Sequence, residues 1–398
     1  PPHHQKSTHT TGPDATKLLT DPVVYQDSES LVPSSLVTSN ADLAAACAHW
    51  STTGAIGIDT EFVRKRTYHP RPGLIQVADN AAVAMVDPLR ISDFGPLGDL
   101  LSDPSVVKVM HAYEEDVEVL ELLTGATPDP IFDTQLAAAF SGYGFSLGYS
   151  KLVEILLDVV LDKGATRSDW LRRPLSETQL KYAALDVLYL LPLHKQLTRD
   201  MAVLDRGAWF EEELGHRQRT RAADKRPEVA YLRVRRRETL PPASHAVLRA
   251  LSQWRETEAM ARDVPRRHLL TDDVLIALAS EPALDEVALE KIQGLSQPAM
   301  TQYGQAIIAC VDTARSQEPD ETDTTVDLRP YSARMKRLKE IVRHKADTHK
   351  LPPELLASSR SLEALLISTM TDQGHIPKTL QGWRLEVVTE TLLEALAH

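Results

Sequence analysis

The sequence has very few cysteines and no long apolar segment. Only Cys47 and Cys310 occur among its 398 residues, and they lie far apart in the chain. Two such thiols provide neither a cysteine-rich zinc site nor the disulfide framework of a small secreted domain. The most apolar run, residues 152–161, is interrupted by Glu154 and Asp158 and is well short of the roughly 20 residues that span a bilayer. We therefore expect a protein without membrane-spanning helices that works in the reducing cytoplasm.

A targeting signal is also missing from the first residues. Residues 1–28 are polar and His-rich, lack the basic-then-apolar order of a secretory signal, and are expected to form a flexible tail. The apolar content of 42% and charged content of 25% are those of a soluble globular protein. At about 100–200 residues per domain, the chain is expected to contain two to four domains.

The charge of the chain is unevenly distributed. The net charge is −12, yet residues 217–237 contain eight Arg and one Lys against two acids, a local charge of +7. A second basic cluster at residues 334–345 directly follows an acidic stretch at 318–327. A run of like charges is usually a solvated face, but either basic cluster is also suited to phosphate contact.

The hydrophobic pattern predicts an α/β region followed by helices only. Strands are expected at residues 55–62, 74–78, 82–86 and 106–111, with the first three forming an antiparallel meander. Helices are expected at residues 113–123, 134–140, 149–157 and 176–197. Composition divides the chain into a tail (1–28), an α/β domain (29–215), a basic connector (216–240), a helical bundle (241–315), an acidic linker (316–328) and a second helical bundle (329–398).

Two acids lie close together in the first predicted strand. Asp59 and Glu61 occur in Ile-Gly-Ile-Asp-Thr-Glu-Phe, so strand alternation points both carboxylates to one face, about 7 Å apart. Facing carboxylates repel unless a cation lies between them, and Mg²⁺ prefers carboxylate ligands. Taken alone, the pair is better explained by a solvated strand end, so other acids must decide between the two interpretations.

A third acid is expected to face the same strand. Residues 114–118 include four acids, each of which alone is typical of a solvated helix face. Asp116 lies four residues before Leu120 and so shares the inward face, whereas Glu114, Glu118 and Glu121 share the solvated side. We therefore favour Asp116 as the acid that joins Asp59.

A tyrosine and a fourth acid share one face of the last helix of the α/β domain. Tyr182 and Asp186 are four residues apart, so their side chains lie one helical turn apart. The phenol is suited to orient a water beside a carboxylate. Alone, this spacing is common in ordinary helices, where the Tyr packs and the Asp is solvated.

In chain order, Asp59-x-Glu61, Asp116 and Tyr182-x3-Asp186 resemble the three motifs of the DEDD exonucleases, in the subclass with tyrosine in the third motif. The segment around Asp162-Lys163, Arg167-Ser168-Asp169-Trp170 and Arg173-Pro174-Leu175-Ser176 resembles the bacterial ribonuclease D family. The first bundle resembles an HRDC domain, with Arg262-Asp263-x-Pro265-Arg266 and Leu269-Leu270-x-Asp272 as its marks. The last bundle resembles a second HRDC domain more weakly.

The resemblance implies a ribonuclease H-like exonuclease domain followed by all-α HRDC-type bundles. It implies a 3′–5′ exoribonuclease that uses two divalent ions, Mg²⁺ or Mn²⁺, and releases 5′-nucleoside monophosphates. By the family's pattern Asp59 bridges both ions, Glu61 and Asp186 complete the ion site that activates water, and Asp116 holds the other ion through its water shell. Tyr182 orients the nucleophile. The implied partner is RNA with a free 3′ end, tRNA precursors in particular, bound by a monomer.

Other prominent residues have structural interpretations. Asp133 is expected to cap the helix that begins at Thr134, and Trp170 is expected to pack. His111 is expected at a strand end and His194 on an exposed helix stretch, both outside catalysis. A basic loop before the Tyr182 helix is a candidate phosphate contact and contains Lys163, Arg167, Arg172 and Arg173.

Two other functions remain open on the sequence. A DEDD exonuclease acting on DNA would use the same metal chemistry, although no polymerase or helicase motif follows the nuclease region. A noncatalytic RNA-binding scaffold would not need the complete set of acids.

Overall fold

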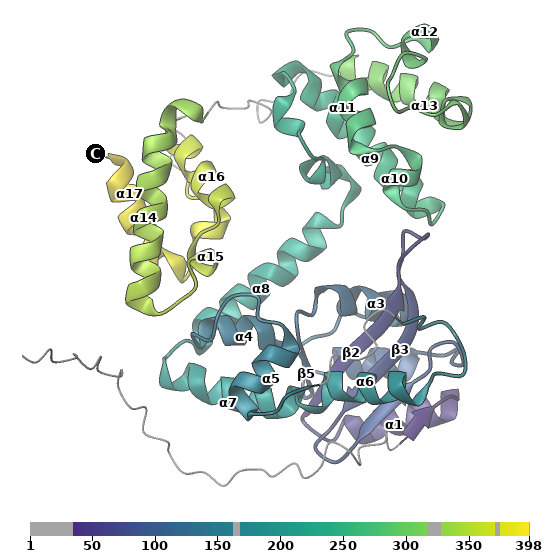
Figure 1. Cartoon of the computed structure of the whole chain (residues 1–398), viewed down its shortest axis with the longest axis vertical. Helices are drawn as coiled ribbons and strands as arrows, with labels where there is room; N and C mark the ends of the chain where they lie inside the picture. Colours follow the sequence, from purple (N-terminus) through teal and green to yellow (C-terminus); the bar gives the residue numbers. More distant parts are fainter. Residues whose placement is uncertain (1–34, 162–167, 317–327, 371–374, 398) are drawn as a thin grey trace, which may run out of the picture.

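The computed structural model describes residues 35–161, 168–316, 328–370 and 375–397 (Figure 1). The expected N-terminal tail, nearly all of the acidic linker, and the candidate phosphate contacts Lys163 and Arg167 lie outside the described residues. Within the described residues, no helix combines the length and the apolarity needed to cross a membrane.

One mixed sheet forms the centre of the α/β domain, with strand order β1-β4-β3-β2-β5-β6. The strands are β1 Ser35–Val37, β2 Ala55–Val63, β3 Arg71–Ala78, β4 Val83–Val86, β5 Val107–Met110 and β6 Ile131–Asp133. Strands β2, β3 and β4 pair antiparallel, which confirms the predicted meander, whereas β5 pairs parallel with β2. Strands β1 and β6 were not predicted, because three residues are too few to show alternation.

Helices cover both faces of this sheet. One group of helices comprises α1 Asn40–Trp50, α2 Gly95–Ser102 and α3 Glu114–Thr124. Helix α2 contacts both α1 and α3, and α3 also contacts β2 and β3. Helices α6 Glu177–Leu188 and α7 Leu190–Val203 cover the face to which Asp59 points. Gly57, two residues before Asp59, makes this close approach feasible, because a Cβ there would lie 3.0 Å from the Cβ of Leu190.

The predicted single helix at 176–197 is wrong, since α6 ends and α7 begins at Tyr189. The Tyr149 hydroxyl donates to the Leu185 carbonyl (3.0 Å) and accepts from the Tyr189 amide (3.1 Å). Those two backbone groups would otherwise bond each other in a continuous helix. A side chain inserted into the helical ladder is a known cause of a break. Tyr149 itself begins α5 Tyr149–Leu157, which follows α4 Thr134–Phe140.

The middle bundle has a hydrophobic core of its own. It comprises α9 His245–Ala261, α10 Arg266–Leu269, α11 Asp272–Ser280, α12 Glu286–Leu289 and α13 Gln297–Ser316. The long helix α8 Gly207–Asp224 leads to it from the α/β domain, followed by the 3₁₀ segment η1 Pro227–Arg233 (Figure 1). Helix α8 therefore continues through the boundary expected after residue 215.

The C-terminal bundle packs against the α/β domain and shares its core. It contains α14 Ser332–His349, α15 Pro353–Leu356, α16 Ser359–Met370, a π-helical segment Leu385–Thr389 and α17 Glu390–Ala397. The Trp383 ring lies 5.3 Å from the rings of Phe140 and Trp209. A buried ion pair joins Arg384 to Glu213 of α8 at 2.7 Å. The sequence pattern did not predict this contact between the first and last units.

Candidate active site

Three carboxylates meet between β2 and α6. Oxygen atoms of Asp59, Glu61 and Asp186 all lie within 4.8 Å of one another. Asp59 and Glu61 lie on the same face of β2, and the close packing of α6 on that strand brings Asp186 to them. Each of the three side chains is partly exposed, so this carboxylate cluster opens to solvent.

Asp116 lies next to the carboxylate cluster but is held separately. It is buried in the first turn of α3, the inward position that its spacing to Leu120 predicts. Its carboxylate accepts hydrogen bonds from the Thr60 hydroxyl (2.6 Å) and the Thr60 amide (3.1 Å). Thr60 lies between Asp59 and Glu61, so it fixes the fourth acid against the strand that carries the other two.

Burial, aided at Asp59, Glu61 and Asp186 by the charges of neighbouring acids, makes the four acids hard to ionise. Burial, followed by the charges of Asp116, Asp186 and Glu61, raises the pKa of Asp59 well above its ordinary value. Burial and the charges of Asp186 and Asp116 raise the pKa of Glu61 to about 8. Burial likewise raises the pKa of Asp186 to about 7 and that of Asp116 to about 6, although the Thr60 hydrogen bonds oppose the shift at Asp116. Charge repulsion of this kind is relieved by a bound cation.

The donor set fits a hard divalent cation. It consists of carboxylate oxygens, which Mg²⁺ and Mn²⁺ prefer, and it contains neither thiol nor imidazole within the described residues. A further polar side chain lies beside it, because Gln76 of β3 is directly opposite Asp59 in the β2–β3 ladder. Gln76 is completely buried, and neither of its amide atoms has a hydrogen-bond partner among the described residues.

Tyr182 lies beside the carboxylate cluster on α6. Its hydroxyl is hydrogen-bonded to Asp186, and burial together with the nearby carboxylates raises its pKa far above the ordinary value. The phenol is therefore fully protonated at neutral pH. Helix α6 begins with a capping box between Ser176 and Gln179, and the buried ring of Trp170 lies 6.3 Å from the Tyr182 ring. Trp170 packs, as predicted.

The loop before α6 is held in place by Arg173. Its guanidinium pairs with Asp87 at 2.6 Å and donates to the carbonyls of Gly73, Trp170 and Arg172. These bonds use all three of its nitrogen atoms and hold this loop on the sheet, while contact of Arg173 with substrate phosphates stays a prediction. Arg172 is exposed and stays a candidate contact.

Three other prominent residues, Asp133, His111 and His194, make contacts that support the fold. Asp133 accepts the Gln135 amide and caps α4, as predicted. His111 contacts Thr134 and the Leu147 carbonyl, and burial lowers its pKa to about 4. His194 was expected on an exposed stretch, but it is half-buried with its ring 4.4 Å from that of Phe132.

Three residues of this region were missed by the sequence analysis. Thr60 and Tyr149 act through hydrogen bonds to residues distant in sequence, which no local pattern records. Gln76 had a signal, because it is the only polar residue in the otherwise apolar run Gly-Leu-Ile-Gln-Val-Ala of β3.

Comparison with models of known protein families identifies the class of protein to which this architecture belongs. A family model described as a 3′–5′ exonuclease matches residues 35–202, and an HRDC domain model matches residues 244–311. The fold and the four acids thus define a 3′–5′ exonuclease with a helical C-terminal region. A model described as the C-terminal HRDC domain of ribonuclease D matches residues 330–392.

The chain belongs to the ribonuclease D family. It is 37% identical to ribonuclease D of Shewanella sp. (strain ANA-3), over 89% of this chain and 92% of that protein. It is 35% identical to ribonuclease D of Escherichia coli (strain K12), over 90% and 96% respectively. The crystal structure of Escherichia coli RNase D, described as an exoribonuclease involved in structured RNA processing, matches with a TM-score of 0.81 and 34% identity. That match covers 91% of this chain and 98% of the other.

Proposed function

We propose that the chain hydrolyses RNA from its 3′ end and releases 5′-nucleoside monophosphates. The observation that carries this proposal is the meeting of Asp59, Glu61 and Asp186 within 4.8 Å, with Asp116 beside them. Family membership supplies the expected reaction, and the acids supply the ligands that this reaction needs.

Two divalent cations, Mg²⁺ or Mn²⁺, are the proposed cofactors. Asp59 would contact both, Glu61 and Asp186 would complete one site, and Asp116 would hold the other through water. When bound, such cations polarise the scissile phosphodiester and make water a stronger nucleophile. The carboxylates contribute negative charge from a rigid strand and helix, so little reorganisation is needed on binding.

Tyr182 is proposed to position the attacking water. A phenol with a pKa raised above its ordinary value is a poor base at neutral pH, so its contribution is orientation. The hydrogen bond to Asp186 and the packing against Trp170 restrict the ring. A fixed hydroxyl beside a carboxylate can hold water in one direction of attack.

The natural substrate is proposed to be structured RNA, with tRNA precursors as the first candidate. The two helical bundles extend away from the sheet of the α/β domain and provide surface for the body of such an RNA (Figure 1). Arg172 is proposed to contact phosphates near the 3′ end, as are Lys163 and Arg167. The protein is proposed to act as a cytoplasmic monomer.

The test uses matched RNA and DNA oligomers of one sequence, each labelled at the 5′ end. With Mg²⁺ or Mn²⁺, the RNA should shorten one nucleotide at a time from its 3′ end, while the DNA is degraded more slowly. Equal or faster degradation of DNA would favour a DNA exonuclease. Tight RNA binding without hydrolysis under either metal would favour a noncatalytic scaffold.

A further inference from the structure

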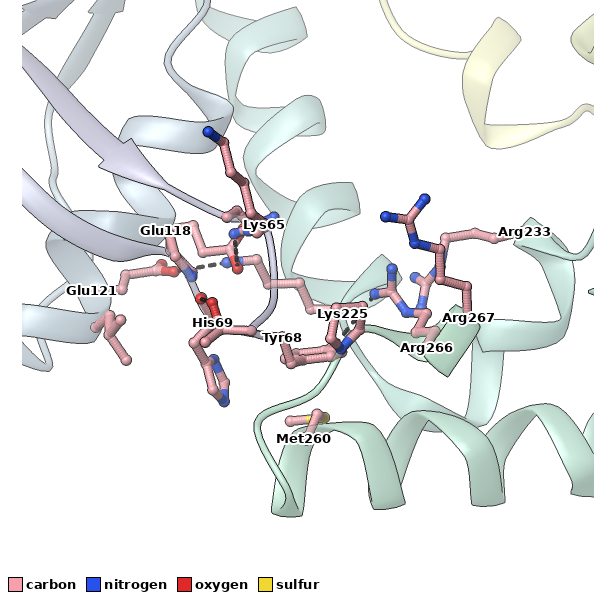
Figure 2. Close-up of a pocket in the computed structure, with 15 residues that line it drawn as sticks. Lys65, Tyr68, His69, Glu118, Glu121, Lys225, Arg233, Met260, Arg266 and Arg267 are labelled. Atoms are coloured by element: carbon pink, nitrogen blue, oxygen red, sulfur yellow. Dashed lines mark hydrogen bonds and ion pairs between the residues drawn. The ribbon is translucent and has the colours of Figure 1, made fainter. Parts of the chain in front are cut away.

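A cavity rich in arginine lies between the α/β domain and the middle bundle, and a second one adjoins it between the basic connector and the bundle. Two adjoining cavities of about 650 and 700 Å³ share Arg233, Arg266 and Arg267 in their walls. One wall is the β2–β3 turn (residues 64–70), and the opposite wall comes from the middle bundle (Figure 2). We refer to the two cavities together as the arginine groove.

The charge of the arginine groove is opposite to that of the whole chain. Nine Lys or Arg side chains and five Asp or Glu side chains line it, whereas the chain as a whole has 44 basic and 56 acidic residues. Part of the positive charge of the basic segment at 217–237 is neutralised by ion pairs within the protein, since Arg221 and Lys225 both pair with Glu121 of α3. The surplus positive charge remains in the groove.

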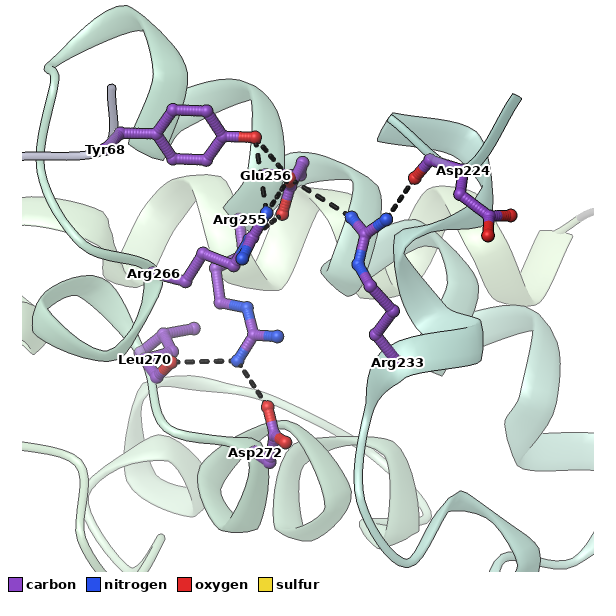
Figure 3. A network of polar contacts seen from close by, with 8 residues as sticks. All are labelled: Tyr68, Asp224, Arg233, Arg255, Glu256, Arg266, Leu270 and Asp272. Atoms are coloured by element: carbon purple, nitrogen blue, oxygen red, sulfur yellow. Dashed lines mark hydrogen bonds and ion pairs between the residues drawn. The ribbon is translucent and has the colours of Figure 1, made fainter. Parts of the chain in front are cut away.

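A buried carboxylate assembles the groove from both domains. Glu256 of α9 accepts hydrogen bonds from Arg233 (3.2 Å), Arg266 (2.5 Å) and the Tyr68 hydroxyl (2.5 Å) (Figure 3). Tyr68 comes from the β2–β3 turn, and the neighbouring His69 amide donates to Asp263 at 2.9 Å. One acid therefore faces two guanidinium groups and ties the turn of the α/β domain to the bundle.

Three cationic side chains of the arginine groove form no ion pair with a carboxylate among the described residues. Lys65, Arg235 and Arg267 are exposed, and the described residues give none of their side chains an ion pair or a hydrogen bond. Lys65 follows Glu61 by four residues, so it lies at most about 13 Å from Glu61 along the chain. The groove thus begins where the strand that carries Asp59 and Glu61 ends.

We infer that the arginine groove binds the phosphate backbone of RNA upstream of the 3′ end held at the carboxylate cluster, through Lys65, Arg235 and Arg267. This inference rests on the proposed function. An extended polyanion suits a groove whose free charges are all positive and whose wall residue Lys65 follows Glu61 by four residues. Paired arginines around Glu256 fix the width of the groove, and the three unpaired cations supply the contacts.

The test is a triple variant, Lys65→Ala, Arg235→Ala and Arg267→Ala, in the full chain. A matched control changes three exposed cations outside the groove, Lys195→Ala, Arg199→Ala and Lys291→Ala. Binding of a 20-nucleotide single-stranded RNA is measured in EDTA by fluorescence anisotropy across a salt series. Equal melting temperatures establish that both variants fold.

Each phosphate contact on a single strand contributes about 0.7 to the slope of log affinity against log salt, so the groove variant should lose a slope of about 2. By the same relation its affinity at 0.1 M salt should fall about 100-fold, while the control keeps the wild-type slope. Identical slopes in both variants would overturn the inference. The inference would also be overturned if the groove variant lost binding of polyglutamate but kept binding of RNA. That result would favour an acidic protein as the partner of the groove.

The outcome separates the groove from the proposed function. If wild-type protein hydrolyses no RNA with Mg²⁺ or Mn²⁺, the proposed function fails. If wild-type protein is active and the triple variant binds RNA like the control, only the groove assignment fails.

A second observation concerns Gln76, the completely buried amide opposite Asp59. Directly opposed residues of an antiparallel pair point to the same face, with Cβ atoms about 4.5–5.5 Å apart. Strand β3 lies between β2 and β4, so the backbone groups around it are already used in the ladders. A buried polar group without a hydrogen-bond partner destabilises the folded state.

The geometry points to Gln76 as a positioning residue for Asp59 in the cation-loaded site. Its amide can donate to the Asp59 carboxylate or accept from a water held there, and either bond would fix the orientation of Asp59. This inference rests on the proposed cation site. It assigns no direct contact with substrate to Gln76.

The test is Gln76→Leu, which keeps the approximate shape and removes the amide, with Gln76→Met as a second shape. Mn²⁺ affinity is measured by calorimetry, and thermal unfolding is followed in EDTA. Removal of an unpaired amide should raise the melting temperature, whereas Mn²⁺ affinity should fall on the order of tenfold. Unchanged Mn²⁺ affinity in both variants would overturn the inference, whatever the melting temperature does. Absence of Mn²⁺ binding by the wild-type protein would instead refute the cation site.

Discussion

Replacement of Asp59 by Asn should stabilise the metal-free protein while it removes cation binding and hydrolysis. Asp59 oxygens lie within 4.8 Å of those of Glu61 and Asp186. Two unit charges at that distance repel by about 3.5 kcal/mol at an effective dielectric constant near 20. Partial exposure and salt reduce this value, so we expect a net stabilisation of about 1–3 kcal/mol when the cluster is ionised.

The pH dependence of this effect has a definite sign. Carboxyl groups with raised pKa values hold protons in the folded state that they release in the unfolded state, so metal-free stability falls as pH rises through their titration. With pKa values of about 7 for Asp186 and about 8 for Glu61, that window extends from the ordinary values near 4 up to pH 8. The gain from Asp59→Asn should therefore be larger at pH 8.5 than at pH 6.

Urea unfolding in EDTA at pH 6 and pH 8.5 measures the stability, and Mn²⁺ calorimetry measures the binding. Asp186→Asn serves as the matched variant on the opposite element and should behave in the same way. A metal-free Asp59→Asn protein that is less stable than wild type at pH 8.5 would refute the repulsion argument. Wild-type turnover in that variant would refute the site.

Three further predictions follow from individual contacts. Tyr182→Phe should lower the single-turnover rate more than it weakens RNA binding, because only the water-orienting oxygen is lost; an equal rate would make Tyr182 a packing residue. Tyr149→Phe should let the Tyr189 amide donate to the Leu185 carbonyl and so join α6 to α7. The joined helix should displace Asp186 and weaken Mn²⁺ binding. Unchanged Mn²⁺ affinity would show that the helix break has another cause. Mn²⁺ affinity of the wild-type protein should rise between pH 6 and 8, because cations bind the ionised carboxylates, and a flat calorimetric profile would contradict the raised pKa values of Asp116, Asp186 and Glu61.

The strands and the inward side of α3 were predictable because they depend on local periodicity. Alternation placed Asp59 and Glu61 on one face of β2, and the spacing to Leu120 selected Asp116 from its acidic neighbours. The meander of β2, β3 and β4 followed from short connections between apolar runs. These features require only information from neighbouring segments of the sequence.

Features that depend on distant partners were not predictable in the same way. The break at Tyr189 requires a hydroxyl from Tyr149, forty residues earlier. Arg173 was grouped with neighbouring cations, yet it forms an ion pair with Asp87, which directly follows β4. The basic segment suggested a free surface, whereas Glu121 and Glu256 neutralise part of it. In each case, tertiary pairing decides what a charged or polar side chain does.

The central claim is most directly tested by the products formed from one RNA. A 5′-labelled oligoribonucleotide with a free 3′ hydroxyl is incubated with Mg²⁺ or Mn²⁺, alongside the same RNA carrying a 3′ phosphate block and alongside the Asp59→Asn variant. Wild-type protein should shorten the free RNA stepwise and release 5′-nucleoside monophosphates, with the blocked RNA resistant and the variant inactive. Internal cleavage of both RNAs, or hydrolysis that persists in Asp59→Asn, would contradict the account.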